Sequence, residues 1–384
     1  MKILFVCKCS PLKEGGAETR SKEVAIQLAR LGQQVTVLCA KTEVEEPEVQ
    51  HFNGIRILSK RVLPDWLLSR FPYPHYLTLA ASSLLLMIHL YRLLREEEFD
   101  LVREDVSPFP PSGLLSLKRL RVGKRIAVAH NLFGTFEEWR KFYGPVYGLA
   151  GFLMDRLLRS GMLKYDQIIC AAKWLKEELE QCPKISGKVR YVPNGVNLDD
   201  FSFGRARRSA NGHIRLLSVG RLVEAKGHRS ILEALSYLKE EHPELRLDIL
   251  GSGPLKESLS KMAAQFKISD LITFRSSVAH KEMPLVYGDY DIFVMASVTE
   301  GFPVALLEAM ASGLPIIATD IPANTGVLDS ASAVFFKSGD AKDLAGRLRW
   351  AIAHRDCMDE NAARAYRLAE QYDWRAIAEK ETLK

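Results

Sequence analysis

Residues 298–315 read Val298-Thr-Glu-Gly-Phe-Pro-Val-Ala-Leu-Leu-Glu-Ala-Met-Ala-Ser-Gly-Leu-Pro315, and this stretch indicates how the chain around it folds. Pro303 suits the first turn of a helix, and Gly313 suits the cap at the end of that helix. Apolar runs of strand length lie on both sides, Asp291–Met295 before the helix and Pro315–Thr319 after it. The order strand, helix, strand is typical of α/β proteins with a parallel sheet.

The same alternation extends over the whole chain of 384 residues. Most of its apolar runs are continuous, which indicates parallel strands covered by helices on both faces. We therefore expect an α/β protein with Rossmann-like, doubly wound sheets. The strand candidates are Lys2–Cys7, Gln34–Cys39, Lys124–Ala129, Asp166–Cys170, Lys188–Val192, Ile214–Gly220, Leu245–Leu250, Leu271–Phe274, Asp291–Met295, Pro315–Thr319 and Ala333–Phe336.

Turn-forming and polar residues indicate where the chain divides. Tyr191–Gly195 ends a strand candidate with Pro and Asn-Gly, and a polar stretch follows before the next strand candidate, so the boundary should lie near Pro193–Arg208. Each half then has the size of one Rossmann-like domain. The last segment, Arg364–Lys384, is predicted to be a helix that is interrupted near Tyr372–Trp374.

Composition narrows the class of protein. Hydrophobic residues make up 47% and charged residues 26% of the chain, which excludes a mainly disordered protein. The N-terminus lacks the apolar stretch and cleavage site of a signal peptide, and the longest apolar run, Leu77–Leu90, is short for a membrane span. The six scattered cysteines form neither a zinc-binding nor a disulfide pattern. We therefore expect a reduced, cytoplasmic protein.

Basic charge gathers in the first half of the chain. Residues 1–195 contain 29 Lys and Arg against 21 Asp and Glu, whereas the remainder contains 24 against 26. Arg61–Arg95 mixes arginines with aromatic and apolar residues, which is the composition of a surface helix that binds anionic lipid. The alternative is that Leu77–Leu90 is a core helix against the sheet. No nucleic-acid motif accompanies the basic residues, so nucleic acid is not an expected partner.

Two carboxylates stand out in the stretch quoted above. Glu308 falls in the middle of the predicted helix among alanines and leucines, where a charge needs a partner such as a ribose diol or an internal arginine. Glu300 lies beside Gly301 just before the helix, where backbone N–H groups suit a phosphate. The alternative is that Glu308 caps a neighbouring loop and that Glu300 is solvated.

Three more candidate segments follow predicted strands. The loop Gly220–Gly227 brings Arg221 and Lys226 to a carboxyl edge of a sheet, where they could hold an anion or be ordinary solvated side chains. The pair Gly15-Gly16 follows the first strand and lets the backbone approach a ligand closely. His130 ends another strand, and a lone histidine there is more often structural than catalytic.

Together these segments resemble the retaining glycosyltransferases of family 4, whose GT-B fold has two Rossmann-like domains facing a central cleft. The resemblance implies an N-terminal acceptor-binding domain over residues 1–200 and a C-terminal nucleotide-sugar-binding domain over residues 206–365. It also implies that a C-terminal helix over about residues 366–384 packs back on the first domain. The motifs that carry the resemblance are the pair Glu300…Glu308, GRLVEAKG, YVPNGVNLDDF, GSGPLKESL, GGAE and His130.

By the same resemblance, the C-terminal domain holds the donor. Arg221 and Lys226 would hold its diphosphate, and Glu308 would accept hydrogen bonds from the ribose hydroxyls. Ser276 and the loop Ile321–Gly326 depart from the family pattern, which leaves the base and the sugar of the donor open.

The resemblance assigns the transferred sugar to other residues. Glu300 would contact the sugar, with the amides of Gly301 and Phe302 nearby. Gly15 and Gly16 would border the phosphate and the acceptor, and His130 would hydrogen-bond the sugar. His130 and Glu300 are thus expected catalytic residues, together with the two cations of the donor site.

The expected activity is transfer of a sugar, with retention, from a UDP or GDP sugar to a saccharide or lipid-linked acceptor of the cell envelope. No cofactor and no metal are expected, because fixed cations would oppose the charge of the leaving diphosphate. An anionic membrane surface is a further expected partner, through the N-terminal domain. The alternatives are a catalytically silent nucleotide-sugar-binding subunit, or another GT-B enzyme such as a phosphorylase or epimerase.

Overall fold

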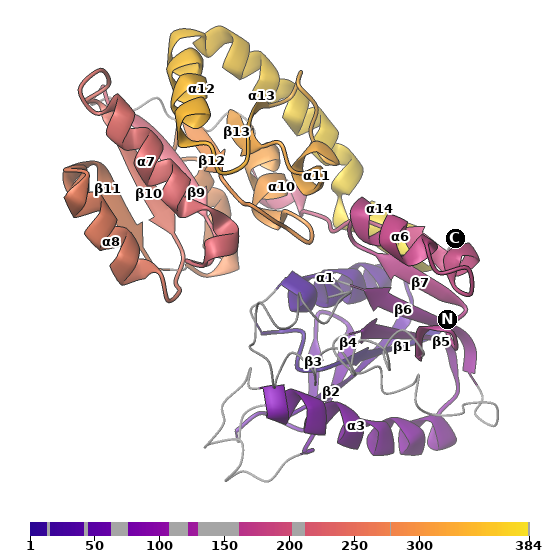
Figure 1. The fold of residues 1–384 in the computed structure, drawn as a ribbon. Coiled ribbons are helices and arrows are strands. Elements are labelled where there is room, and N and C mark those ends of the chain that lie inside the picture. The colour runs from indigo at the N-terminus through magenta and orange to yellow at the C-terminus, as the bar shows by residue number, and fades with distance from the viewer. Residues whose placement is uncertain are drawn as a thin grey trace. The chain divides into compact units, whose positions relative to one another are not determined.

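The structure, a computed structural model, describes residues 1–13, 16–41, 45–62, 76–106, 122–129, 161–201, 212–276 and 278–382; the side chains of residues 76–84, 106 and 280 are outside this description. The chain forms two compact units (Figure 1). Unit 1 comprises Met1–Asn194 and Trp374–Lys384, and unit 2 comprises Gly195–Asp373. The division after Asn194 lies within the stretch Pro193–Arg208 where the sequence places the boundary, and the chain returns to unit 1 at Trp374 rather than at about residue 366.

Unit 1 is built on a sheet in the order β3-β4-β2-β1-β5-β6-β7-β8. Neighbouring strands are parallel except β3 and β4. The chain builds outward from β1 to β4 and then crosses to β5 on the other side of β1, so the sheet is doubly wound as predicted. The strands are β1 (Lys2–Cys7), β2 (Gln34–Ala40), β3 (Val49–Phe52), β4 (Ile55–Lys60), β5 (Phe99–Val106), β6 (Val122–Ala129), β7 (Gln167–Cys170) and β8 (Val189–Tyr191).

Successive side chains of β1 divide between two cores, because side chains alternate along a strand. Phe5 packs with α1 (Gly16–Arg30) and α14 (Trp374–Thr382), whereas Leu4 packs with α3 (Tyr76–Glu96). Figure 1 shows α1 and α14 on one face of this sheet and α3 on the other. A third cluster joins α6 (Lys173–Glu180) to β7.

The helix α3 is a core helix, as the alternative reading of Leu77–Leu90 predicted. Its residues Leu86, Leu90, Leu93 and Leu94 are buried against the sheet. None of the helices in the described ranges is long and apolar enough to cross a bilayer.

Unit 1 also buries charged side chains that connect α14 to the sheet. Arg103 on β5 and Arg20 on α1 are fully buried, and both donate hydrogen bonds to the carboxylate of Glu381 on α14. Arg20 Nη2 lies 2.6 Å from Glu381 Oε2, and Arg103 Nη1 lies 2.9 Å from Asp105 Oδ1. Burial by itself would raise the pKa of Glu381, but the charges of Arg103 and Arg20 hold it below its usual value.

Unit 2 is built on a wholly parallel sheet in the order β11-β10-β9-β12-β13-β14. The chain builds from β9 to β11 in one direction and then crosses to β12 on the other side of β9. This sheet is therefore doubly wound too. Its strands are β9 (Ile214–Val219), β10 (Leu245–Leu250), β11 (Ile272–Arg275), β12 (Ile292–Met295), β13 (Ile316–Thr319) and β14 (Val334–Phe336).

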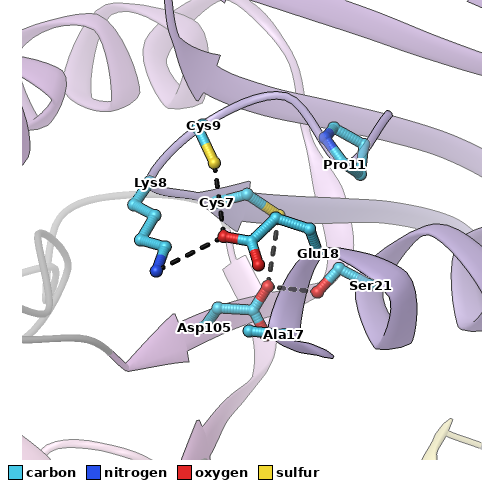
Figure 2. Close-up of a pocket in the computed structure, with 8 residues that line it drawn as sticks. All are labelled: Cys7, Lys8, Cys9, Pro11, Ala17, Glu18, Ser21 and Asp105. Atoms are coloured by element: carbon cyan, nitrogen blue, oxygen red, sulfur yellow. Dashed lines mark hydrogen bonds and ion pairs between the residues drawn. The ribbon is translucent and has the colours of Figure 1, made fainter. Parts of the chain in front are cut away.

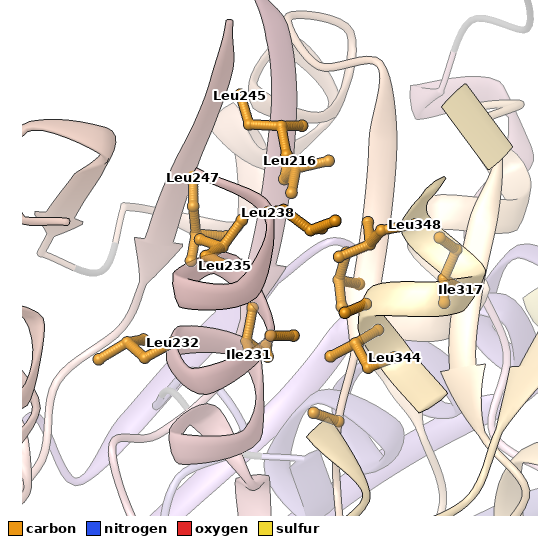
Figure 3. Close-up of a cluster of buried hydrophobic side chains, with 14 of the residues drawn as sticks. Leu216, Ile231, Leu232, Leu235, Leu238, Leu245, Leu247, Ile317, Leu344 and Leu348 are labelled. Carbon is orange, nitrogen blue, oxygen red and sulfur yellow. The ribbon is translucent and has the colours of Figure 1, made fainter. Parts of the chain in front are cut away.

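Helices cover both faces of this sheet. One core joins the strands to α7, α8 and α12, and Figure 3 shows leucines of α7 and α12 packed on those of β9 and β10. The other core joins them to α9, α10 and α13, and the break predicted near Tyr372–Trp374 separates α13 from α14. The helices are α7 (His228–Leu238), α8 (Lys256–Gln265), α9 (Met283–Tyr287), α10 (Val304–Ala311), α11 (Pro322–Thr325), α12 (Ala341–Ala353) and α13 (Arg355–Ala369).

The buried charges of unit 1 lead to a stability prediction. We expect Glu381→Ala to lower the free energy of unfolding by about 3–5 kcal/mol, because two buried guanidinium groups lose the carboxylate that they share. The matched control is Glu379→Ala on the same helix, whose exposed pair with Arg375 contributes roughly 0–1 kcal/mol. Urea unfolding followed by circular dichroism measures both, and equal losses in the two variants would contradict the prediction.

Removal of the same charge also predicts a change in the pH dependence of stability. Because the folded pKa of Glu381 is lowered, its stabilisation is complete above the unfolded pKa of about 4.3 and is lost as the pH falls through the folded value. Glu381→Gln should therefore flatten the acid side of the stability profile, whereas Glu379→Gln should not.

Candidate functional site

The switch point of unit 2 lies between the neighbouring strands β9 and β12, where the order in which the chain adds strands reverses. In doubly wound sheets, ligands bind outside the carboxyl ends of the strands at such a point. The loop Gly220–Gly227 follows β9, and residues 296–301 follow β12. Both segments that the sequence singled out in this half therefore lie at one edge of one sheet.

Close backbone packing holds these two loops together. Gly227 has a φ of +62°, and a Cβ there would lie 1.9 Å from the carbonyl oxygen of Ala296. In addition, the Val298 N–H donates a hydrogen bond of 2.9 Å to the Ala225 carbonyl. Only glycine allows this approach, so Gly227 sets the distance between the loops.

The neighbouring glycine turn supports the same loop from the other side. A Cβ at Gly251 would lie 2.0 Å from the carbonyl oxygen of Gly220, and one at Gly253 would lie 2.5 Å from that of Leu222. Gly251 and Gly253 therefore pack their backbone closely against the loop that follows β9.

The side chains of Lys226 and Glu300 meet across the switch point. Lys226 Nζ lies 2.5 Å from Glu300 Oε1, and the two side chains are 21% and 9% exposed. The Ser297 hydroxyl donates a hydrogen bond of 2.7 Å to the same oxygen. Glu300 is therefore not the solvated residue of the alternative interpretation.

Residues that the sequence analysis did not single out extend this arrangement into the core. The Thr319 hydroxyl, at the carboxyl end of β13, donates 2.7 Å to the Ser297 carbonyl. The Asn324 amide donates 3.0 Å to the Thr319 hydroxyl, and both side chains are fully buried. Polar residues just after predicted strands were the available signal, but only the fold shows that they are bonded to one another.

Glu308 lies on α10, which starts one residue after Pro303 and is followed by Gly313 with a φ of +69°. Its side chain is buried, and the Tyr287 hydroxyl donates a hydrogen bond of 2.8 Å to its Oε2. Burial, followed by the charge of Glu308, raises the pKa of Tyr287 well above its usual value. The sequence predicted a buried carboxylate that needs a partner, and this partner is a tyrosine.

The other predicted site residues of unit 2 are Arg221, Gly301 and Phe302. Arg221 is exposed, and its side chain makes no ion pair or hydrogen bond with the part of the chain that the structure describes. Gly301 and Phe302 connect Glu300 to α10, and the ring of Phe302 lies 6.3 Å from that of Tyr372. The structure thus brings Lys226 and Glu300 into contact and leaves Arg221 facing solvent.

Unit 1 has its own switch point, between β1 and β5. A small pocket there is lined by both strand ends and the start of α1 (Figure 2). Lys8 Nζ lies 3.3 Å from Glu18 Oε1, and the Cys9 thiol donates to the same oxygen at 3.4 Å. Asp105 accepts hydrogen bonds from Ser21 and, at 3.3 Å, from the Cys7 thiol.

The two glycines and the histidine predicted for this half are only partly described. Gly16 opens α1, and the next residue, Ala17, lines that pocket. Gly15 and His130 lie outside the described residues. No group of three His, Cys, Asp or Glu side chains within the described ranges is arranged to hold a metal ion.

Two doubly wound sheets with polar side chains at their switch points define an α/β protein of the class whose members bind ligands at the strand ends. Sequence models of two families match it: glycosyl transferases group 1 over residues 203–371, and glycosyltransferase family 4 over residues 14–200. The chain belongs to these glycosyltransferase families.

Curated relatives include glycosyltransferases of several kinds. WcaL of Escherichia coli, named for colanic acid biosynthesis, is 29% identical over 63% of this chain and 60% of its own length. The sulfoquinovosyl transferase SQD2 of Arabidopsis thaliana is 25% identical over 95% of this chain and 69% of its own. The chain thus spans about three fifths to two thirds of the length of these relatives.

Solved structures share the fold at low sequence identity. The sucrose-phosphate synthase of Thermosynechococcus elongatus has a TM-score of 0.83 at 19% identity and covers 99% of this chain and 96% of its own. Alr3699/HepE of Anabaena, in complex with UDP, has a TM-score of 0.73 at 15% identity over 99% and 98%. The fold is GT-B, as the resemblance implied.

The close packing of the two loops leads to a prediction about glycine. Gly212 also has a positive φ, but a Cβ there would meet nothing within 4 Å. We expect Gly212→Ala to cost roughly 1–2 kcal/mol from backbone strain, and Gly227→Ala to cost about 1–3 kcal/mol more from overlap with Ala296. Urea midpoints measure both, and equal costs would show that the contact with Ala296 is unimportant.

Proposed function

We propose that this glycosyltransferase moves a sugar from a nucleoside-diphosphate sugar to a saccharide or lipid-linked acceptor, with retention at the anomeric carbon. The observation that carries the proposal is the contact of Lys226 with Glu300 at the switch point of unit 2. A cation and a carboxylate there match the two needs of such a donor, an anionic diphosphate and a hydroxylated sugar.

The donor site in this proposal combines two cations of different geometry with a carboxylate. Arg221, exposed and without a partner among the described residues, provides a planar fork for phosphate oxygens, and Lys226 adds a point charge. Glu308 accepts hydrogen bonds from the ribose hydroxyls. The structure of HepE, a protein with the same fold, is a complex with UDP, which supports a nucleotide as the ligand.

Charge separation is the main difficulty of the reaction, and this site opposes it. As the bond from the anomeric carbon to the diphosphate breaks, negative charge grows on the leaving phosphate and positive charge on the sugar ring. Lys226 and Arg221 stabilise the phosphate without a metal, and Glu300 stabilises the sugar. The leaving phosphate accepts the proton of the acceptor hydroxyl, which attacks from the same face. His130 hydrogen-bonds the sugar in this proposal.

The acceptor belongs to unit 1 in this proposal, at the switch point between β1 and β5 where Glu18 and Asp105 lie. By the family resemblance Gly15 and Gly16 border the acceptor, and Gly16 opens α1. A lipid-linked acceptor fits the outer surface of α3, where Ile88 is 49% and Tyr91 43% exposed. The exposed residues Arg92 and Arg95 lie beside them.

Spacings of three, four and seven residues put these α3 side chains on one stripe, away from the buried leucines. Aliphatic, aromatic and basic side chains together suit the interface of an anionic bilayer. Peripheral attachment to the inner face of the membrane of a cytoplasmic enzyme is therefore part of the proposal.

Lys226→Ala tests the role of the cation. We expect kcat to fall by roughly 10²–10³-fold, because a preorganised charge opposite the leaving group is lost. Donors are first selected from UDP and GDP sugars by thermal shift, since a tight ligand raises the melting temperature. Release of nucleoside diphosphate then measures transfer, and the anomeric proton of the product reports retention by NMR.

The matched control is Lys261→Ala, which removes an exposed lysine of α8 that is not part of the proposed site. It should retain the wild-type rate. Wild-type turnover in Lys226→Ala would contradict the assignment of the cation. Donor binding without turnover on any acceptor would instead favour a silent subunit, and phosphate-dependent cleavage or epimerisation would favour another GT-B enzyme.

A second experiment tests membrane attachment. We expect the wild type to sediment with phosphatidylglycerol vesicles at low salt, and the double variant Ile88→Glu, Tyr91→Glu to remain in the supernatant. Val49→Glu is the control, because Val49 is 52% exposed in unit 1 but lies on β3. A wild type that stays in solution would rule the attachment out.

A further inference from the structure

The hydrogen bond between Tyr287 and Glu308 joins the predicted donor site to the core of unit 2. Tyr287 is the last residue of α9, and its side chain is fully buried. Its hydroxyl lies 2.8 Å from Glu308 Oε2 and 3.1 Å from the carbonyl oxygen of Ala305. A phenol carries one proton, and the charged carboxylate is the stronger of the two acceptors. Glu308 therefore receives the main hydrogen bond.

The core fixes the position of this hydroxyl. The ring centroid of Tyr287 lies 6.1 Å from that of Phe201 and 5.8 Å from that of Phe293, in edge and tilted geometries. Phe201 and Phe293 are themselves buried. Aromatic packing of this kind leaves the ring one orientation, so the donor cannot follow a moving carboxylate.

The proton stays on the phenol over the whole working range. Burial and then the negative charge of Glu308 raise the pKa of Tyr287 well above the usual value for tyrosine. Tyr287 therefore stays protonated and is the donor in this pair.

A bond to a fixed donor constrains the carboxylate. A carboxylate has about four acceptor positions, and a donor held by the core on Oε2 sets the rotation of the group about its last bond. The direction of each remaining acceptor position is then set as well. Hydroxyl recognition depends on that direction, because a hydrogen bond weakens steeply when it is bent.

We propose that Tyr287 is a positioning residue: it orients the Glu308 carboxylate so that this group can accept hydrogen bonds from a vicinal diol, the ribose of the donor. The inference rests on the proposed function, because the diol is that of a bound nucleotide. It adds that recognition of the ribose depends on a residue which does not touch the nucleotide.

A purely structural tyrosine would behave differently in one measurement. Phenylalanine keeps the aromatic packing, so Tyr287→Phe removes the hydroxyl and leaves the ring. UDP, GDP and ADP are titrated into the wild type by calorimetry, and the diphosphate that binds is compared with its 2′,3′-dideoxy analogue. The ratio of the two dissociation constants measures the contribution of the diol.

We expect a wild-type ratio of roughly tenfold or more, since hydrogen bonds to a carboxylate are charge-assisted. Tyr287→Phe should lower this ratio at least about threefold, mainly by raising the dissociation constant of the ribonucleotide. Glu308→Gln should lower it too, and adding Tyr287→Phe to Glu308→Gln should change it no further, because the two residues act as a unit. Loss of packing would weaken both ligands alike and leave the ratio unchanged.

Tyr290→Phe is the matched control. Its hydroxyl also donates to a carboxylate, 2.6 Å from Asp248 Oδ2, but that carboxylate is not Glu308, and the ratio should stay at the wild-type value. Should the Phe variant fail to fold, Tyr287→Met removes the same donor with a side chain that adapts to gaps.

The outcomes separate this inference from the proposed function. A wild type that binds none of the three diphosphates overturns the proposed function. A wild type that discriminates against the dideoxy analogue, with the same ratio in Tyr287→Phe, overturns the positioning role and leaves the function standing.

Discussion

Parallel strands all end at one edge of their sheet, and this constraint decides where the protein can place polar chemistry. In unit 2 the neighbouring strands β9 and β12 end at the switch point, and the loops that follow them carry Lys226 and Glu300. The loops approach closely only because Gly227 has no Cβ to meet the carbonyl of Ala296. The position of the ion pair therefore depends on a backbone contact made by a residue with no side chain.

Carboxylates removed from water recur through both units, and each has a donor that the core holds in place. Glu381 accepts hydrogen bonds from two buried guanidinium groups, Glu308 accepts one from a buried phenol, and Glu300 accepts from a lysine and a serine. The cost of burying a charge is thereby offset in each case. In unit 1 this arrangement attaches the last helix, and in unit 2 it shapes the candidate donor site.

Much of the fold could be predicted, because parallel strands buried on both faces leave continuous apolar runs. The runs at Lys2–Cys7 and Leu245–Leu250 match β1 and β10 in full. β5 was missed, since Arg103, Glu104 and Asp105 interrupt its apolar pattern. Their partners, among them Glu381, come from distant parts of the chain. No local pattern shows that such charges will be satisfied inside a sheet.

Local sequence determined the elements, the α/β class and the residue types at the strand ends, because periodicity and turn chemistry act over a few residues. The ends of α10 follow in this way from Pro303 and Gly313. Only the tertiary structure decided which of these residues meet. Lys226 and Glu300 are 74 positions apart, and Tyr287 and Glu308 are 21 apart. Such contacts arise from strand order and from the packing of whole helices, neither of which is encoded in any short segment.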